Sequence, residues 1–274
     1  MYKIIACDLD ETLLSTTDRK VSAQNIAAVK AARERGVKFV VATGRGFPSV
    51  SGTLTELGLL DLPDEYVISF NGAAITENRG NRLLHCVDMP FETVKKLFDR
   101  AANFDLGAHI YTLDTVYGYH FTDNERAYLA GRMTVVERDD WDMDFLRGDT
   151  IVKILFVNPD QNYLWQMERE FADITADLTV SFSSNRYIEF SPLGVDKGAG
   201  LLKLAEILGV KPAETIAIGD NFNDLSMIRA AGLGVGVANC VDGIKPDCNY
   251  ITAATCDEGA VAEVINKFIT EGRK

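Results

Sequence analysis

The sequence lacks the features that mark secreted and membrane-spanning proteins. It has no run of roughly 18 apolar residues, the length that a membrane span needs. Its first residues lack both the apolar length and the small-residue cleavage site of a signal peptide. The five cysteines form an odd set without any Cys-x-x-Cys spacing, so reduced thiols are favoured over a disulfide framework or a zinc site. We therefore expect a cytoplasmic protein without membrane contact.

Positive charge is also scarce. The chain has 28 lysine and arginine residues against 40 aspartate and glutamate residues, which gives a net charge of −12. This balance opposes binding to nucleic acid, although a small phosphorylated metabolite is compatible with it if a cation and a few donors set the local field. The three histidines have no paired or helical ligand spacing, and we interpret them as surface or core residues rather than metal ligands.

The apolar runs predict an α/β core with a parallel sheet. Strands are predicted over residues 3–7, 37–42 and 66–70, and the first two flank an amphipathic helix over residues 22–35. In this helix Ser22 is the predicted N-cap, with Ile26 and Val29 pointing inward and Gly36 ending it. The second half of the chain returns to this texture, with helices over 198–208, 223–231 and 258–268 and strands over 215–220, 233–237 and 249–252.

The middle of the chain has a different texture. Residues 109–121 and 179–190 are rich in aromatics and predict hairpin-forming strands. The other elements expected in this part are helices near 91–104 and 162–171 and a strand over 150–157. We predict a core domain made of residues 1–82 and 191–274, and an inserted α+β domain over residues 83–190.

Two carboxylates follow the first predicted strand, in the stretch "CDLDETLL". In an extended segment, residues i and i+2 project to the same side, so Asp8 and Asp10 crowd two negative charges unless a cation relieves them. Turn formation alone also accounts for an Asp-x-Asp pair. The spacing therefore suggests a metal site without establishing one.

Polar residues and glycines follow two further strands and precede one helix. They are Thr43-Gly44-Arg45, Gly219-Asp220-Asn221-Phe222-Asn223-Asp224 and Gly194-Val195-Asp196-Lys197-Gly198. Each segment alone is explained by a turn or a helix cap. Together they supply carboxylates for a hard cation, and a hydroxyl and an ammonium for phosphate oxygens. Because ligands of open α/β sheets collect at the carboxyl ends of the strands, we predict one phosphate site there.

With these four motifs, in this order, the sequence resembles the haloacid dehalogenase superfamily. The position of the insertion resembles a C2-type cap, and "TGR", "NGA" and "GVDKG" resemble the Cof-type sugar-phosphatase branch. The resemblance implies a Rossmann-like core whose inserted cap selects the substrate. One residue departs from the pattern, because Glu11 stands where the branch usually has glycine, and this bears on substrate choice more than on reaction type.

The resemblance also implies a reaction and its residues. It is a Mg²⁺-dependent hydrolysis of small phosphorylated metabolites, sugar phosphates first, through an aspartyl-phosphate on Asp8 with Asp10 as general acid and base. The implied metal ligands are Asp8, Asp220 and the backbone carbonyl of Asp10, with Asp224 in support. Thr43, Lys197, Asn223 and the backbone amides of Leu9 and Gly44 are expected to hold the phosphoryl oxygens.

Other functions stay open at this point. A phosphomutase would use the same aspartyl-phosphate, and a non-enzymatic sensor of phosphorylated metabolites would share the fold but lose the nucleophile. Cysteine phosphatases and P-loop enzymes are disfavoured, because neither Cys-x5-Arg nor G-x-x-x-x-G-K-[ST] occurs. The glycines at 232, 234 and 236 are too closely spaced for a dinucleotide site and are expected within a strand. The protein is expected to be a monomer or a homodimer.

Overall fold

The computed structural model describes residues 1–271, which fold into two compact units. The first unit combines Met1–Cys86 with the chain from Asp196 onward, and the second is Val87–Val195. No helix within the described residues is long and apolar enough to cross a membrane.

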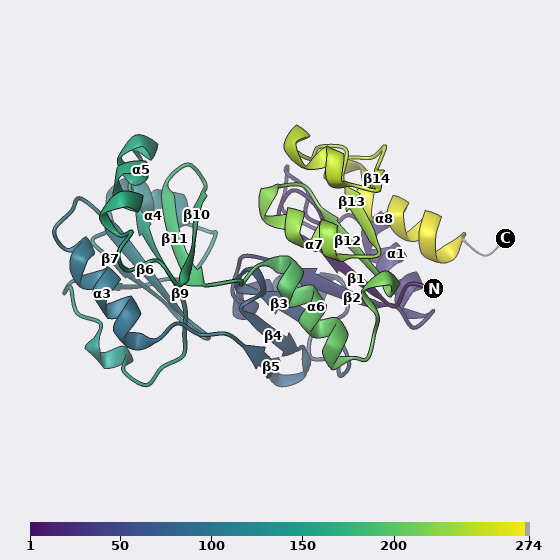
Figure 1. The fold of residues 1–274 in the computed structure, drawn as a ribbon. Helices are drawn as coiled ribbons and strands as arrows, with labels where there is room; N and C mark the ends of the chain where they lie inside the picture. Colours follow the sequence, from purple (N-terminus) through teal and green to yellow (C-terminus); the bar gives the residue numbers. More distant parts are fainter. Residues whose placement is uncertain (272–274) are drawn as a thin grey trace. The chain divides into compact units, whose positions relative to one another are not determined.

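The first unit is built on an eight-stranded sheet in the order β14-β13-β12-β1-β2-β3-β4-β5 (Figure 1). The six strands from β14 to β3 pair in parallel, and β4 pairs antiparallel with both of its neighbours. The prediction of an α/β fold with a parallel sheet is confirmed. The strand bounds are Ile4–Cys7 (β1), Lys38–Ala42 (β2), Tyr66–Ser69 (β3), Ala74–Glu77 (β4), Arg82–Cys86 (β5), Thr215–Gly219 (β12), Leu233–Gly236 (β13) and Tyr250–Ile251 (β14).

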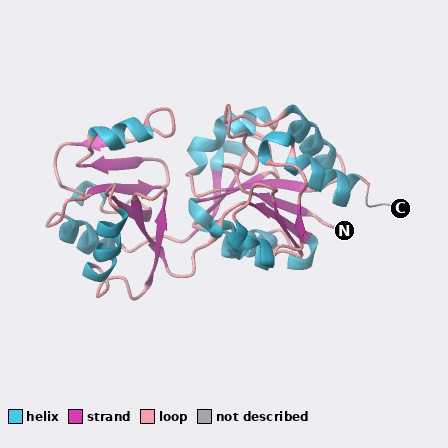
Figure 2. Ribbon diagram, turned by 90° about the horizontal axis from the view of Figure 1, so that it is seen from above, coloured by secondary structure: helices cyan, strands magenta, loops and turns pink. Residues whose placement is uncertain are grey.

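Helices cover both faces of this sheet (Figure 2). Apolar side chains of α6 and α7, such as Leu204 and Met227, pack against Ile4 and Val40 of the central strands. Helices α1 and α8 contact each other. This burial on both faces explains why the central strands read as continuous apolar runs. The helix bounds are Ala23–Arg33 (α1), Ser51–Glu56 (α2), Lys197–Ile207 (α6), Leu225–Ala230 (α7) and Ala260–Ile265 (α8).

Helix α1 begins and ends as the sequence predicted. The Ser22 side chain accepts a hydrogen bond from the backbone N–H of Asn25 at 3.2 Å, and Gly36 has a φ of +78° just beyond the last turn. Val29 is buried, but Ile26 is only half-buried. The inner position beside Val29 is taken instead by Asn25, whose Oδ1 accepts the backbone N–H of Ala262 in α8 at 2.9 Å.

The second unit has a six-stranded sheet in the order β10-β11-β9-β6-β7-β8. The two predicted hairpins are present, because β6 pairs antiparallel with β7 and β10 with β11. Helix α4 and strand β8 were not predicted. The bounds are Phe91–Ala101 (α3), Gly107–Thr112 (β6), Val116–Tyr119 (β7), Asp123–Leu129 (α4), Val136–Arg138 (β8), Ile151–Val157 (β9), Gln161–Glu170 (α5), Leu178–Ser183 (β10) and Tyr187–Pro192 (β11).

Both boundaries between the two units lie a few residues later in the chain than predicted. The second unit spans Val87–Val195, whereas the predicted insertion spans residues 83–190. Strand β5 remains in the first unit because it pairs with β4 through residue 86. Strand β11 remains in the second unit because it pairs with β10 through residue 192. Strand pairing, which composition does not report, therefore sets both boundaries.

The two faces of the second unit's sheet differ in chemistry. One face packs on α3 and α5 through an apolar cluster that includes Phe98, Phe156 and Leu164. His109 of β6, Leu155 of β9 and Glu189 of β11 lie in one row across the sheet, because Leu155 pairs with both of the others. Because side chains alternate along a strand, these residues occupy the opposite face.

Buried charges on this opposite face are paired. The Lys153 ammonium donates to Glu189 at 2.8 Å, and both side chains are buried. Glu125 of α4 accepts hydrogen bonds from the Tyr187 hydroxyl at 2.7 Å and from Arg186 at 3.1 Å. The Nε2 atom of His109 lies 3.0 Å from the same carboxylate.

Candidate active site

The parallel register of β12, β1 and β2 brings the predicted motifs to one edge of the sheet. Cys7 pairs with Ile218 on one side and with Val41 on the other. The backbone N–H of Asp8 continues this ladder by donating to the Ile218 carbonyl at 2.9 Å. The ends of the three strands therefore meet at the point where each predicted motif begins.

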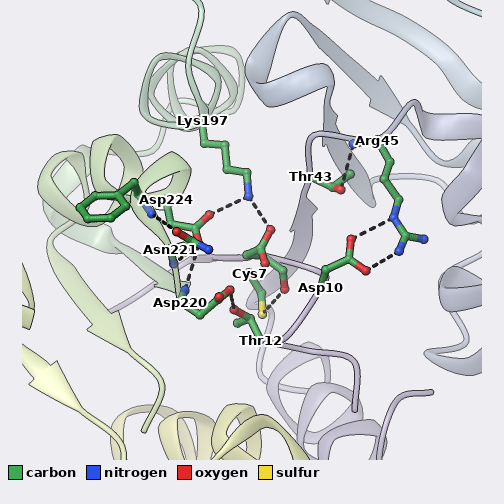
Figure 3. A network of polar contacts seen from close by, with 11 residues as sticks. Cys7, Asp10, Thr12, Thr43, Arg45, Lys197, Asp220, Asn221 and Asp224 are labelled. Atoms are coloured by element: carbon green, nitrogen blue, oxygen red, sulfur yellow. Dashed lines mark hydrogen bonds and ion pairs between the residues drawn. The ribbon is translucent and has the colours of Figure 1, made fainter. Parts of the chain in front are cut away.

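A buried cluster of three carboxylates and one ammonium occupies this edge (Figure 3). The Lys197 side chain is fully buried, and its Nζ donates to Asp8 and, at 2.6 Å, to Asp224. Asp8, Asp220 and Asp224 are buried as well. The structure thus brings together four of the residues that the sequence predicted.

Helix α6 and its first glycine position Lys197. Asp196 caps the helix by accepting the backbone N–H of Ala199 at 2.8 Å, which makes Lys197 its first residue. A Cβ at Gly198 would lie 2.5 Å from the Ser226 carbonyl oxygen, so only glycine permits this close approach to α7. Gly198 therefore allows α6 and α7 to pack closely, with Lys197 at the start of α6 beside the cluster.

The turn after β12 fixes the other two carboxylates. The Asp224 Oδ2 accepts the backbone N–H groups of Asp220 at 2.9 Å and of Asn221 at 3.1 Å. The Asp220 Oδ1 accepts the Thr12 hydroxyl at 2.7 Å. A Cβ at Gly219 would lie 2.4 Å from the Asp224 Cβ, so this turn requires glycine. Thr12 was quoted in the first motif without a role, and its tie to Asp220 became visible only in the fold.

The pKa values report the crowding of negative charge. Burial, followed by the neighbouring Asp224, raises the pKa of Asp8 well above its ordinary value. Burial also raises the pKa of Asp220 to about 6. Burial alone would lower the pKa of Lys197, but Asp224 and Asp8 outweigh it and raise that pKa instead. The carboxylates repel one another more than the single lysine relieves.

This cluster fits a divalent cation. Asp8, Asp220 and Asp224 each offer an oxygen, and these oxygens lie within 4.8 Å of one another. Three carboxylates and one ammonium leave an excess of two negative charges in a buried site. Hard cations such as Mg²⁺ take oxygen ligands of this kind. The donor set and its charge therefore match a metal of charge +2.

The predicted phosphate-binding groups of the first two strand ends lie beside this cluster. Thr43 is buried, and its hydroxyl accepts the backbone N–H of Arg45 at 3.1 Å. The backbone N–H groups of Leu9 and Gly44 donate to no acceptor among residues 1–271. Free backbone donors at strand ends suit phosphate oxygens.

The Asp10 carboxylate points toward Arg45 rather than toward Lys197 (Figure 3). Arg45 donates its Nε to Asp10 at 2.9 Å and its Nη2 to the other carboxylate oxygen. Arg19 adds a longer contact of 3.3 Å. Sequence reasoning assigned no role to either arginine. "TGR" was quoted only as a family likeness, and nothing in the sequence places Arg19 near Asp10.

Asn223 does not join the cluster. It is exposed in the turn Phe222–Asp224, and its side chain makes no hydrogen bond within the described part of the chain. The amide that shapes this turn is Asn221, which accepts the backbone N–H of Phe222 at 2.8 Å. The prediction that Asn223 contacts phosphoryl oxygens stays a prediction.

Glu11 adopts a backbone conformation that explains why glycine is usual there. Its φ is +60°, in the left-handed region that glycine adopts without cost. The Asn239 side chain donates to the Glu11 carbonyl at 2.8 Å and so helps to hold the loop. The Glu11 side chain is exposed.

Comparison with known proteins shows the family of this chain. The model of the family described as haloacid dehalogenase-like hydrolase matches residues 5–265. The HMP-PP phosphatase of Serratia proteamaculans (strain 568) is 29% identical, over 98% of this chain and 96% of the relative. The 5-amino-6-(5-phospho-D-ribitylamino)uracil phosphatase YwtE of Bacillus subtilis (strain 168) is also 29% identical, over 98% of each chain.

A solved structure shares the fold over the same length. The crystal structure of a haloacid dehalogenase-like hydrolase from Bacteroides thetaiotaomicron is 30% identical and has a TM-score of 0.85. The match covers 98% of this chain and 100% of that chain. This chain therefore belongs to the haloacid dehalogenase-like hydrolases, as its four motifs predicted.

Proposed function

We propose that this hydrolase is a Mg²⁺-dependent phosphatase that acts on small phosphorylated metabolites through an aspartyl-phosphate on Asp8. The observation that carries the proposal is the buried cluster in which Asp8 lies beside Lys197, Asp220 and Asp224 with two negative charges in excess. A phosphomonoester resists nucleophiles mainly through its own negative charge. A site that combines a cation, a buried carboxylate nucleophile and phosphate donors addresses that barrier.

Asp8 and Asp10 would share the covalent chemistry. An oxygen of Asp8 forms a bond to phosphorus while the bond from phosphorus to the leaving oxygen breaks. Asp10 gives a proton to that leaving oxygen, and then takes one from the water that hydrolyses the aspartyl-phosphate. The products are the free alcohol and inorganic phosphate, and Asp8 returns to its starting state.

The remaining residues of the site would bind and align the phosphoryl group. Lys197 and the Thr43 hydroxyl would hold its oxygens, together with the free backbone N–H groups of Leu9 and Gly44. Mg²⁺, when bound, supplies positive charge that neutralises the phosphate and the attacking carboxylate. Its ligands would be Asp8, Asp220 and the Asp10 backbone carbonyl, with Asp224 in support.

We further propose that the inserted domain, predicted over residues 83–190, is the cap that selects the substrate. It forms most of the second compact unit, Val87–Val195. None of the four motifs falls within residues 83–190. Sugar phosphates are the substrate class that we propose first. The names of the two relatives describe different substrates, so likeness alone does not fix that of this chain.

The experiment that tests the proposal is a phosphate-release assay over a panel of phosphorylated metabolites. Activity should require Mg²⁺, disappear reversibly in chelator, and be poorly supported by Ca²⁺, whose longer bonds loosen the alignment. Asp8→Asn should abolish turnover, and acid quenching of the wild type with ³²P-labelled substrate should trap label on the protein. Full activity in excess chelator would exclude the metal role. Absence of trapped label, with turnover intact in Asp8→Asn, would exclude the nucleophile.

The same assay distinguishes a phosphatase from a phosphomutase, which transfers the phosphoryl group back to a sugar. A phosphomutase would convert a sugar monophosphate into an isomer, whereas a phosphatase releases inorganic phosphate. Deletion of Val87–Val195, the second compact unit, should reduce activity toward sugar phosphates more than activity toward a small aryl phosphate. An equal loss for every substrate, in a deletion variant that is still folded, would contradict the proposed role of the inserted domain.

A further inference from the structure

Two arginines surround the one carboxylate of the site that does not face the buried cluster. Arg45 holds Asp10 through two of its nitrogens, and Arg19 contacts the same carboxylate at 3.3 Å. The two guanidinium groups carry a charge of +2 and Asp10 carries −1. This group of three residues therefore has one positive charge in excess, whereas the buried cluster beside it has two negative charges in excess.

The arginines have donors to spare. A guanidinium has five N–H donors, but Asp10 uses only the Nε and Nη2 of Arg45 and the Nη2 of Arg19. The other guanidinium nitrogens of both residues make no hydrogen bond among residues 1–271. The side chains are 26% and 43% exposed, so these donors can reach a ligand.

The backbone at Arg19 is strained. Its φ is +58°, in the left-handed region that L side chains other than asparagine and aspartate rarely adopt. The turn is held by the Arg19 N–H on the Ser15 carbonyl at 3.1 Å and by Asp257, which accepts both the N–H and the hydroxyl of Thr16. Turns use this region too, but residues held in it are enriched at active and ligand-binding sites. In this turn the left-handed residue is Arg19, whose guanidinium is the second one beside Asp10.

We infer that Arg45 and Arg19 form an anion-binding pair on the leaving-group side of the site, and that this pair raises kcat/KM for a substrate whose leaving group is anionic above that for the matching substrate with a neutral leaving group. The inference rests on the proposed function, because it is the proposed role of Asp10 that puts the arginines on the leaving-group side. Organic diphosphates are the simplest substrates of this class. A guanidinium pair matches the paired oxygens of a phosphate.

The step is balanced without any further reactant. The Asp8 oxygen bonds to the terminal phosphorus, and the bond from that phosphorus to the bridging oxygen breaks. The electron pair stays on the bridging oxygen, so the departing organic monophosphate takes up the charge that the arginines stabilise. Water then attacks this phosphorus and gives a proton to Asp10, the bond between phosphorus and the Asp8 oxygen breaks, and inorganic phosphate leaves; Asp10 then releases that proton to solvent. An alcohol leaving group needs a proton at the same place, whereas a phosphate leaving group needs positive charge.

The test compares the monophosphate and the diphosphate of one alcohol, such as isopentenol, by kcat/KM for phosphate release. The wild type should favour the diphosphate. Arg45→Met should lower kcat/KM for the diphosphate by about tenfold to a hundredfold, the effect of one or two charge-assisted hydrogen bonds. The monophosphate should lose much less. Arg45→Lys keeps the charge but not the paired donors, and should recover only part of the loss.

A matched variant and a binding measurement guard against a merely structural effect. Arg35→Met removes a guanidinium just beyond the end of α1 that donates to the Ala31 carbonyl of that helix, and it should change kcat/KM for neither substrate. Calorimetry should show that inorganic pyrophosphate binds Arg45→Met more weakly than the wild type, with circular dichroism confirming that the variant is folded.

The outcomes for the inference and for the proposed function are distinct. Unchanged pyrophosphate binding in Arg45→Met, or equal losses for monophosphate and diphosphate, would overturn the inference and leave the phosphatase assignment intact. Absence of phosphate release from every substrate would overturn the phosphatase assignment. The pyrophosphate measurement would still decide whether the arginines bind anions.

Discussion

The two compact units each bury a group of charged side chains, and the two groups differ in their balance. In the first unit, three carboxylates face one lysine, so the buried cluster carries two negative charges in excess. In the second unit, Lys153 pairs with Glu189 and Arg186 pairs with Glu125. Each of these pairs is neutral. The lysine and the glutamate of the first pair are buried, as the catalytic candidates are.

This difference shows what separates a structural ion pair from a ligand site. A buried pair of opposite charges satisfies itself, and breaking it leaves an uncompensated charge. A buried excess of one sign is costly in the free protein and becomes favourable only when a ligand of the other sign arrives. Burial and a charged side chain therefore do not identify a site. The uncompensated charge does.

The largest expected effect uses the same substitution in the two groups. Lys197→Met removes the ammonium that faces the three carboxylates of the buried cluster, and with it a proposed donor to the phosphate oxygens. We therefore expect kcat/KM for p-nitrophenyl phosphate to fall by about a thousandfold or more. Lys153→Met should leave kcat/KM for this small substrate within about threefold of wild type, because it removes no group from the phosphate site. Steady-state kinetics with Mg²⁺ on folded samples measure both. Comparable losses of kcat/KM in the two variants would contradict the proposal that the buried cluster of the first unit is the site of phosphate chemistry.

The second effect concerns stability of the second unit. Among residues 1–271, Lys153→Met leaves the buried Glu189 with Ser183 as its one remaining side-chain hydrogen-bond donor, and breaking such a buried pair costs about 3–5 kcal/mol. Replacing both residues by methionine removes both charges and should recover most of that loss. The chain's two tryptophans, Trp141 and Trp165, both lie in the second unit, so their fluorescence during denaturation reports this unit. A double variant as unstable as the single one would contradict the pairing.

The third effect is a pH dependence of the first unit. A pKa raised to about 6 means that folded Asp220 holds its proton more tightly than the unfolded chain does. Its contribution to stability is complete below its ordinary pKa and is lost as the pH rises through about 6. Metal-free wild type should lose about 2 kcal/mol more than Asp220→Asn between pH 4 and pH 7. Thermal melts by circular dichroism measure this difference, and Mg²⁺ should reduce it. Parallel pH profiles of the two proteins without metal would refute the crowding of charge at Asp220.

The central strands of the fold and the four residues of the buried cluster could be predicted, because both follow from patterns of neighbouring residues in the sequence. Apolar, β-branched runs predicted the central strands, since such strands are buried on both faces. Asp8, Asp220, Asp224 and Lys197 could be placed together because parallel strands end at one edge.

The rest depends on geometry that one sequence does not contain. Arg19 reaches Asp10 only through a left-handed turn, and no composition signal marks its φ of +58°. Asn223 and Asn221 carry the same side chain two positions apart, and only the conformation of the turn decides which one shapes it. The end of β5 depends on its pairing with β4, which is a contact between segments.

The smallest expected effect is a pH dependence of the second unit with the opposite sign. His109 is fully buried, and burial lowers its pKa although Glu125 beside it acts in the other direction. Glu189 favours the charged imidazole as well, and Lys153 opposes it. A histidine with a lowered pKa contributes stability above its ordinary pKa of about 6.5, and this contribution is lost as the pH falls. Tryptophan fluorescence should therefore show that wild type loses more stability than His109→Phe between pH 7.5 and pH 5.

This last effect isolates one side chain. The exposed His120 belongs to the same unit, and His120→Gln is the matched variant for the loss of one histidine. The first unit should gain stability through Asp220 over the same fall in pH, because that carboxyl binds its proton more tightly when folded. Opposite signs in the two units would follow from charge balance. The carboxyl titrates among like charges, whereas the imidazole is kept neutral by burial in a group whose charges are already paired. If His109→Phe and wild type lose the same stability on acidification, burial does not hold His109 in its neutral form.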